Sequence, residues 1–337
     1  MIPELPGYLL AIEQELRAVI APPQADLTPF YNMLAYHLGW MDERFQPAQA
    51  DSGKRIRPLL CLLACQATGG DWHAALPAAA ALELVHNFSL IHDDIEDNSS
   101  TRRGRPTVWT VWGLPQGINA GDGMLALAHR ALLRCQKRDP ALALAAMDIL
   151  DQTVLSLCHG QFLDIAIEGN LDLTEGAYLT MIGGKTASLL AASPQLGALL
   201  GGAGALSKHY RQFGWHLGLA FQMVDDVLGI WGDPKVTGKP AADDIVSRKM
   251  TLPVVYTLRS SPLSEELAAL YRQEHLSEAD VQLALGILER SGARDYTQGQ
   301  ARRHESGALA ALDAAQPRES AVGALRELAQ SLTARIK

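Results

Sequence analysis

Residues Leu90 to Thr107 read LIHDDIEDNSSTRRGRPT, and they end an apolar run with a cluster of carboxylates. Asp93 and Asp97 are four residues apart, so on a helix they lie about 40° apart on one face, and Asp94 flanks that face. Carboxylates this close repel one another, and the negative end of the helix dipole adds to the cost. Mg²⁺, which prefers oxygen ligands, would compensate their charge. The segment therefore predicts a helix that leaves the core and ends in a magnesium-binding acidic turn, with a solvated helix end as the alternative.

Helical periodicity dominates the rest of the chain. Apolar residues recur at three- and four-residue steps in YLLAIEQELRAVI, AAALELVHNFSLIHDD, HLGLAFQMVDDVLGIWG and several other segments. Alternating patterns bounded by tight-turn signals, which would indicate strands, are absent. The segments TGGDW, GRPT, KRDP and GDPKVTGKP carry turn residues and separate the helices. We predict one all-α domain over residues 1–337 with ten or more helices, several of them apolar nearly all round and buried.

Composition excludes some functions. The 337 residues are 48% hydrophobic and carry a net charge of −8, which argues against a nucleic-acid partner. The chain has four cysteines, which fits a reducing, cytoplasmic location, and its first residues lack the cationic start of a secretory signal. The most apolar stretch, residues 186–206, is broken by polar residues, proline and glycine, so we expect no stable membrane insertion.

A second acidic cluster follows another apolar helix. The segment FQMVDDVLGIWGDPKVTGKP places Asp225 and Asp226 where the first cluster has Asp93 and Asp94. A solvated helix end would explain either cluster alone, but two such clusters favour carboxylates that face each other across a cavity.

Basic residues accompany both clusters. They are Lys54, Arg55 and Arg57 in SGKRIRP, Arg102 and Arg103 after the first cluster, Lys185 in IGGKTAS, Lys239 in GKP and Lys249 in SRKMT. Arginine matches the fork geometry of phosphate and lysine supplies a point charge. So many carboxylates and cations together indicate several Mg²⁺ ions and two polyanionic groups, and the apolar surroundings indicate that the rest of the ligand is hydrocarbon.

Together these motifs resemble the trans-isoprenyl diphosphate synthases, also called polyprenyl synthetases. GKRIRP, ELVHNFSLIHDDIEDNSSTRRGRPT, GQFLDI, MIGGKTASLL and FQMVDDVLGIWGDP occur in the order typical of that family, over about residues 52–258. The resemblance implies an all-α fold around a deep central cavity and a homodimer.

The resemblance also implies roles for individual residues. The Mg²⁺ ligands would be Asp93, Asp94, Asp97 and Asp225, for three ions, with Mn²⁺ as an alternative metal. Asp93, Asp94 and Asp225 would also act in catalysis together with Lys185, Thr186 and Gln222. The allylic diphosphate would contact Arg102, Lys185 and Lys239. The second substrate, isopentenyl diphosphate, would contact Lys54, Arg57, His86 and Arg103.

The implied reaction is ionisation of the allylic diphosphate, attack by the isopentenyl double bond and loss of a proton, with water kept away from the cation. The second motif departs from the DDxxD pattern of many members, because Gly229 stands at its last aspartate. Asp225 remains, and Asp233, Asp243 and Asp244 are near in sequence, so we expect an active enzyme.

Product length depends on the residue five positions before Asp93, which is Phe88. In the family this position faces the growing chain, and a bulky ring there limits elongation. We therefore expect a product of fifteen to twenty carbons, geranylgeranyl diphosphate rather than farnesyl diphosphate.

Three other functions fit parts of the pattern. A class I terpene cyclase shares the aspartate motif, but it does not need GKRIRP or the arginine pair to hold a second diphosphate. A non-catalytic subunit of the same family is the binding-only alternative. An HD-type phosphohydrolase would use His86 and His92 with Asp93, but the two histidines are six residues apart, which places them about 120° apart on different faces of a helix.

Overall fold

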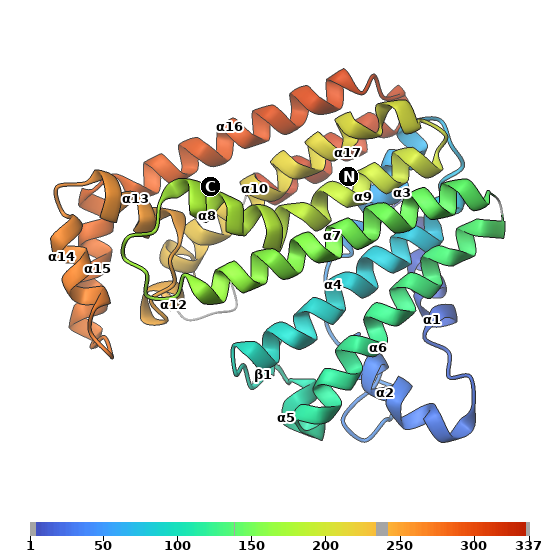
Figure 1. Cartoon of the computed structure of the whole chain (residues 1–337), viewed down its shortest axis with the longest axis horizontal. Helices are drawn as coiled ribbons and strands as arrows, with labels where there is room; N and C mark the ends of the chain where they lie inside the picture. Colours follow the sequence, from blue (N-terminus) through green and yellow to red (C-terminus); the bar gives the residue numbers. More distant parts are fainter. Residues whose placement is uncertain (1–4, 138, 234–241, 335–337) are drawn as a thin grey trace. The chain divides into compact units, whose positions relative to one another are not determined.

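The structure is a computed structural model that describes residues 5–137, 139–233 and 242–334 (Figure 1). Its α-helices are α1 (Leu5–Val19), α2 (Thr28–His37), α3 (Ile56–Ala67), α4 (Leu76–Glu96), α5 (Val108–Trp112), α6 (Leu114–Leu133), α7 (Pro140–Ala166), α8 (Glu175–Ile182), α9 (Ser188–Leu200), α10 (Ser207–Trp231), α12 (Asp243–Val246), α13 (Leu252–Ser260), α14 (Ser264–Tyr271), α15 (Glu278–Arg290), α16 (Ala293–Ala314) and α17 (Glu319–Thr333). The prediction of an all-α fold with ten or more helices is confirmed.

Two local elements were not predicted from the sequence. One is a short hairpin in which β1 (Thr101–Arg102) pairs antiparallel with β2 (Arg105–Pro106). Its turn residues Arg103 and Gly104 both have positive φ, 52° and 73°, which matches the twist of a tight hairpin. The other is a π-helical turn, η4 (Gly183–Ala187), between α8 and α9. Both are too short to leave a periodic pattern in the sequence.

The chain forms two compact units. Unit 1 comprises Met1–Gln152, Ser193–Ser207 and Pro317–Ala324, and unit 2 comprises Thr153–Ala192, Lys208–Gln316 and Leu325–Lys337. The boundaries fall inside long helices, because α7, α9 and α17 contribute residues to both units. That the whole chain acts as a single domain stays a prediction.

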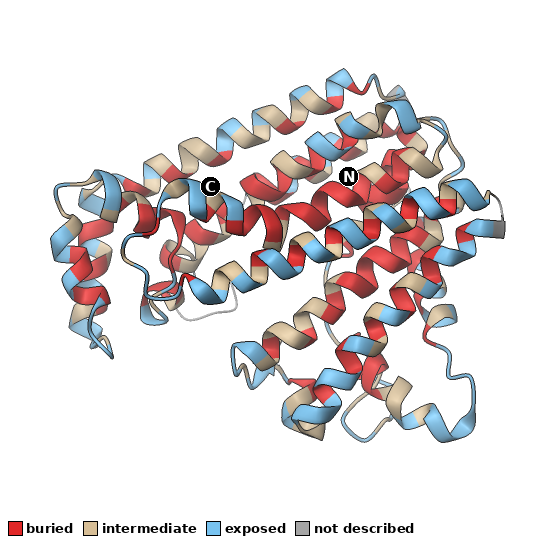
Figure 2. Ribbon diagram, in the orientation of Figure 1, coloured by how far each residue is buried: buried red, intermediate tan, exposed pale blue. Residues whose placement is uncertain are grey.

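In unit 1 the core is built around α3 and α4. Every residue of α3 from Pro58 to Cys65 is buried, as is every residue of α4 from Ala78 to Val85 (Figure 2). Helices α1, α3 and α6 contact α4, and α6 lies alongside it (Figure 1). The expectation that helices apolar on all sides are buried is confirmed for α3 and for the first half of α4.

In unit 2 the helix α10 packs backbone to backbone against its neighbours. A side-chain carbon on Gly214 would lie 2.7 Å from the Ala191 Cα, and one on Gly218 would lie 2.5 Å from the Ala187 Cα. Only glycine permits so close an approach at these two positions. The separation of α10 from η4 and the start of α9 is therefore set by main-chain contact.

Helix α7 is apolar in composition but leaves several large apolar side chains exposed. Its exposed side chains include Leu144 (71% exposed), Leu155 (59%) and Phe162 (70%), which lie within about 20° of one line along the helix. Within the described residues, the stretches Trp72–Glu96 and Pro140–Ala166 are long and apolar enough to cross a membrane by length and composition, a test that core helices also pass. The first stretch is mostly buried and the second is not, so α7 exposes several large apolar side chains, with the exposed carboxylates of Asp148 and Asp151 between Leu144 and Leu155.

Candidate active site

The first aspartate motif ends α4 in unit 1. Asp97 caps the helix, and Asn98 follows in the left-handed conformation (φ 51°), which asparagine tolerates better than most residues. The Ser99 amide then donates to the Asp94 carbonyl oxygen at 2.8 Å. The chain thus leaves the helix abruptly, with Asp97 exposed and Asp93 half-buried at its end.

Asp94 points into unit 1. It is 1% exposed, and its Oδ1 accepts a hydrogen bond from the Arg102 Nε at 2.7 Å. Its Oδ2 is buried and accepts no hydrogen bond from the described residues. Burial raises the pKa of Asp94 to about 6, opposed by Arg102 and assisted by the negative charges of Asp93 and Asp97.

These carboxylates suit a hard divalent cation by the chemistry of their oxygen atoms. A buried carboxylate oxygen without a donor, next to two more carboxylates, is an environment that Mg²⁺ would stabilise. In the described part of the chain, no three His, Cys, Asp or Glu side chains already surround one ion position. The argument for Mg²⁺ at these carboxylates therefore rests on the chemistry of their oxygen atoms and on their negative charge.

The β1–β2 hairpin brings two predicted arginines to the same region. Arg102 pairs with Asp94 as described above, and Arg103 reaches the loop that precedes α3. The Arg103 Nη2 lies 2.8 Å from the position of a side-chain carbon on Gly53, so a larger residue there would displace the guanidinium. The loop and the hairpin, which are about fifty residues apart in sequence, therefore share one cationic surface.

Two histidines lie within this cationic surface. Burial holds the pKa of His86 well below its usual value, and Arg57 and Arg103 lower it further. Burial together with Arg102 and Arg103 lowers the pKa of His37 to about 3. Both imidazoles are therefore neutral near pH 7, and they are surrounded by positive charge. We call Arg57, His86, Arg102, Arg103 and His37 the arginine pocket.

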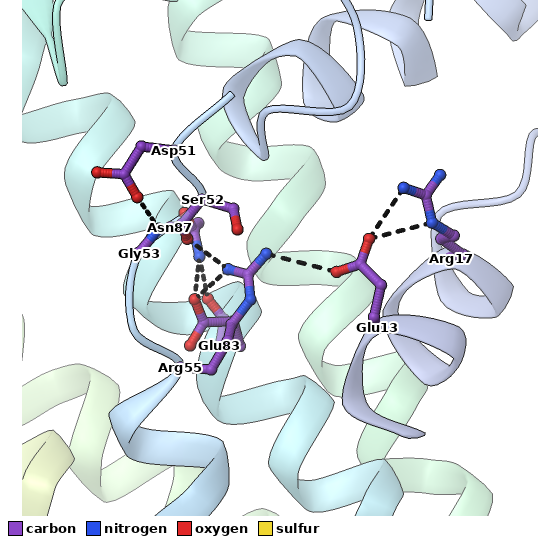
Figure 3. A network of polar contacts seen from close by, with 8 residues as sticks. All are labelled: Glu13, Arg17, Asp51, Ser52, Gly53, Arg55, Glu83 and Asn87. Carbon is purple, nitrogen blue, oxygen red and sulfur yellow. Dashed lines mark hydrogen bonds and ion pairs between the residues drawn. The ribbon is translucent and has the colours of Figure 1, made fainter. Parts of the chain in front are cut away.

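Arg55 belongs to the structural support of this pocket (Figure 3). It is 6% exposed, and its Nη1 donates to Glu83 Oε1 at 2.6 Å and to the Ser52 carbonyl oxygen at 2.9 Å. The Asn87 Nδ2 also donates to Glu83 Oε1, at 3.0 Å, and Glu13 lies 3.7 Å from Arg55 Nη2. Glu83 is thereby neutralised inside unit 1. Lys54, next to Arg55 in sequence, is exposed.

In unit 2 the turn η4 carries Lys185 and Thr186. The Lys185 Nζ donates to Asp164 Oδ2 at 2.6 Å, so the aspartate of the GQFLDI segment on α7 orients this lysine. The Thr186 Oγ1 donates to Gln222 Oε1 of α10 at 2.8 Å. A π-helical turn widens the helix locally and is common at functional sites. Here it presents these two side chains toward partners on different helices.

A chain of buried hydrogen bonds continues from Gln222. Its Nε2 donates to Asp226 Oδ1 at 3.1 Å. The Tyr178 hydroxyl and the Leu252 amide both donate to Asp226 Oδ2, at 2.5 Å and 2.8 Å. Burial raises the pKa of Asp226 to about 6, although all three donors favour the carboxylate. Asp226 therefore joins α8, α10 and the start of α13, while half-buried Asp225 keeps the outer position expected of a metal ligand.

The structure brings most predicted residues together in two sets. Unit 1 holds the first aspartate motif with Arg57, His86, Arg102 and Arg103, and unit 2 holds Lys185, Thr186, Gln222 and Asp225. Phe88 is 6% exposed and makes an edge contact with the ring of His92, 5.6 Å between centroids. Lys239 lies outside the described residues. Asp93 and Asp225 belong to different units, so their convergence on shared ions stays a prediction, as do the individual roles.

His37 and Tyr178 were missed by the sequence analysis. His37 ends α2 in the segment YHLGW, which matches none of the quoted motifs, and its charged neighbours come from distant segments. Tyr178 lies two helical turns before Lys185, so the two residues would share one face of a helix. This spacing could have indicated Tyr178 as a residue of the site.

Comparisons with known proteins show the class of enzyme to which this all-α fold with acidic helix ends belongs, the prenyl diphosphate synthases. A family model described as polyprenyl synthetase matches residues 39–288. A farnesyl diphosphate synthase of Mycobacterium bovis is 45% identical over 278 residues, covering 81% of this chain and 77% of the relative. A geranylgeranyl diphosphate synthase of Mycobacterium tuberculosis is 45% identical over 287 residues, covering 84% and 81%.

Solved structures agree with these sequence relatives. A polyprenyl synthetase from Streptomyces coelicolor A3(2) superposes with a TM-score of 0.91 at 37% identity and covers 98% of this chain and 99% of that one. The chain belongs to the polyprenyl synthetase family. It is a trans-prenyl diphosphate synthase, and therefore a transferase.

Proposed function

We propose that the protein condenses isopentenyl diphosphate with an allylic diphosphate, head to tail, and that its main product is geranylgeranyl diphosphate rather than farnesyl diphosphate. Relatives that carry each of these two names are equally similar to this chain at 45% identity, so they do not separate the two products. The observation that carries the condensation is the arginine pocket beside the first aspartate motif. It offers a diphosphate cationic groups that are distinct from the carboxylates.

The arginine pocket suits the non-ionising diphosphate of isopentenyl diphosphate. Arg57 and Arg103 supply positive charge, and guanidinium groups match phosphate oxygens in geometry. His86, which is neutral, donates a hydrogen bond without adding charge. This diphosphate stays on the product, so the pocket needs only to bind and orient it.

The allylic diphosphate is held at the aspartates and leaves as pyrophosphate. Bound Mg²⁺, with Asp93, Asp94, Asp97 and Asp225 as its proposed ligands, would neutralise the charge that develops on the leaving group. Lys185, fixed by Asp164, contributes a positive charge. The oxygens of Thr186 and Gln222, fixed by their mutual hydrogen bond, present dipoles to the allylic cation. The departing pyrophosphate accepts the proton that is lost when the new double bond forms.

Phe88 supports the proposed product length. It is buried on α4, five residues before Asp93, and its ring is held against His92. A hydrocarbon chain that grows along α4 away from the aspartates meets this ring after a few isoprene units. The ring therefore limits the length of the product chain.

We further propose a cytoplasmic homodimer in which α7 of each copy is covered by the other. The side chains of Leu144, Leu155 and Phe162 are apolar and exposed, and burying apolar surface favours association by roughly 25 cal/mol per Å².

A direct assay tests the proposed function. The purified protein is incubated with Mg²⁺, labelled isopentenyl diphosphate and, in turn, dimethylallyl, geranyl and farnesyl diphosphate. We expect incorporation of label and a twenty-carbon product by chromatography. A product that stops at fifteen carbons would contradict the chain-length proposal, and no consumption of isopentenyl diphosphate would contradict the condensation itself.

A further inference from the structure

Two glycines of α6 set how closely this helix approaches α4 in unit 1. Gly117 and Gly121 are one helical turn apart, and α6 lies alongside α4 (Figure 1). A Cβ on residue 117 would lie 2.9 Å from the Ile95 Cδ1. A Cβ on residue 121 would lie 3.0 Å from the His92 Cε1, with the His92 Nε2 and Cδ2 nearer still. The imidazole of His92 therefore occupies the space that any side chain at position 121 would need.

His92 is held by α6 and in turn contacts Phe88. Its Nε2 donates to the Ile118 carbonyl oxygen at 3.3 Å and lies 3.7 Å from Asp122 Oδ1. Phe88 is one turn earlier on the same face of α4, and its ring makes an edge contact with the imidazole at an interplanar angle of 86°. Such an aromatic pair contributes more than the area that it buries. The imidazole thus lies between α6 and the ring of Phe88 and supports that ring.

A side chain at position 121 would break this arrangement. A Cβ there would lie well inside the van der Waals distance of the His92 Nε2, and a small tilt of the imidazole would not relieve the clash, so His92 would have to change its rotamer. Staggered rotamers are about 120° apart, so the imidazole would leave Phe88. Phe88 would then stay on α4 without the ring that supports it.

We propose that His92, packed on Gly121, is a positioning residue for Phe88 and thereby sets the length of the product chain, and that Gly121 acts on product length only through His92. This role rests on the proposed function, in which the ring of Phe88 limits elongation. The mutual exclusion of the His92 imidazole and a side chain at position 121 does not rest on it.

The test asks whether the three positions act in series. The variants are His92→Ala, Gly121→Val and Phe88→Ala, together with the double variants His92→Ala/Gly121→Val and His92→Ala/Phe88→Ala. Gly123→Val, alone and with His92→Ala, is the matched control, because a Cβ at position 123 would meet the ring of Phe30 on α2. Product lengths are measured by chromatography at equal consumption of isopentenyl diphosphate, and melting temperatures are measured without ligands.

We expect His92→Ala and Gly121→Val each to raise the ratio of longer to shorter products by about two- to tenfold, the scale of one aromatic pair. Their double variant should match His92→Ala, because the imidazole through which Gly121 acts is already gone. In the Phe88→Ala background, the loss of His92 should lengthen the product no further. Gly123→Val should leave the product unchanged.

The melting temperatures report the exclusion itself. The losses caused by His92→Ala and Gly121→Val should not add in their double variant, because the imidazole that valine would displace is absent there. The losses caused by His92→Ala and Gly123→Val should add, because position 123 faces a different helix.

Products of wild-type length from His92→Ala or Gly121→Val, with longer products from Phe88→Ala, would overturn the proposal. So would further lengthening when His92→Ala is added to Phe88→Ala, or a Gly123→Val product as long as that of Gly121→Val. If Phe88→Ala leaves the product unchanged, the limit at Phe88 fails and the role of His92 in product length fails with it. If wild type transfers no prenyl group, the proposed function fails, and the melting temperatures still decide whether a side chain at position 121 displaces His92.

Discussion

Replacing Tyr178 by phenylalanine removes one oxygen atom from the centre of unit 2. That hydroxyl donates to Asp226 Oδ2 at 2.5 Å, and both residues are at most 4% exposed. In the variant, Asp226 keeps the Leu252 amide and Gln222 as donors. We expect the carboxylate to shift and Gln222 to lose its fixed orientation toward Thr186.

The size of the effect follows from the burial. A hydrogen bond to a charged group contributes roughly 1.5–3 kcal/mol, and no solvent replaces it here. With an unfolding entropy of roughly 2.1 cal/mol/K per residue over 337 residues, this lowers the melting temperature by about 2–4 °C. If the same free energy is lost from the transition state, turnover slows about tenfold to a hundredfold.

The assay combines melting curves with steady-state kinetics. We expect a lower melting temperature and a lower kcat, with KM for isopentenyl diphosphate unchanged because the arginine pocket is untouched. Tyr210→Phe is the matched control, since Tyr210 is fully buried and its hydroxyl has no hydrogen-bond partner in the described part of the chain. Unchanged kcat in Tyr178→Phe, despite a lower melting temperature, would show that the tyrosine only stabilises the fold and would refute this reasoning.

Four further changes test other features. Phe88→Ala should lengthen the product by at least one isoprene unit, measured by chromatography, and an unchanged product would remove this ring as the chain-length limit. Glu83→Gln leaves the buried Arg55 charge with only the more distant and more exposed Glu13 as a carboxylate partner, and should cost about 3 kcal/mol in the free energy of unfolding by denaturant titration; the double variant with Arg55→Met should lose less. His37, with a folded pKa of about 3 against 6.5 unfolded, stabilises the fold fully above pH 6.5 and progressively less as pH falls toward 3. Between pH 7 and 5 this amounts to about 2 kcal/mol, so His37→Gln should flatten that part of the stability curve, and a curve parallel to wild type would argue against it. Phe162→Glu should halve the mass measured by sedimentation if α7 is the dimer contact, whereas an unchanged dimer would place the contact elsewhere.

The sequence predicted features that depend on local spacing. The all-α fold and the acidic end of α4 follow from three- and four-residue periodicity and from carboxylates one turn apart. The approach of Arg103 to the loop before α3 was expected only through the family resemblance, because nothing in the spacing relates two segments about fifty residues apart.

The remaining features of the site depend on the orientation of individual side chains and on the packing of distant helices. Arg55 and Arg57 look equivalent in GKRIRP, yet Arg55 has left-handed backbone geometry (φ 52°) and is held by Glu83 of α4. The carboxylate missing at Gly229 was visible in the sequence, but the approach of Asp244 to this glycine depends on how α12 packs. The exposure of large apolar side chains on α7 could not be read from the sequence, because hydropathy reports how apolar a helix is and not what covers it.

The two glycines through which α10 meets η4 and α9 have a practical consequence for engineering. Main-chain atoms in contact cannot be compressed or repacked as side chains can, so the alignment of Gln222 with Thr186 tolerates almost no substitution at Gly214 or Gly218. A mutant library aimed at new product lengths should therefore leave Gly214 and Gly218 unchanged. Its diversity is better placed along α4, where side chains rather than backbones meet and where altered volumes leave the helices in register.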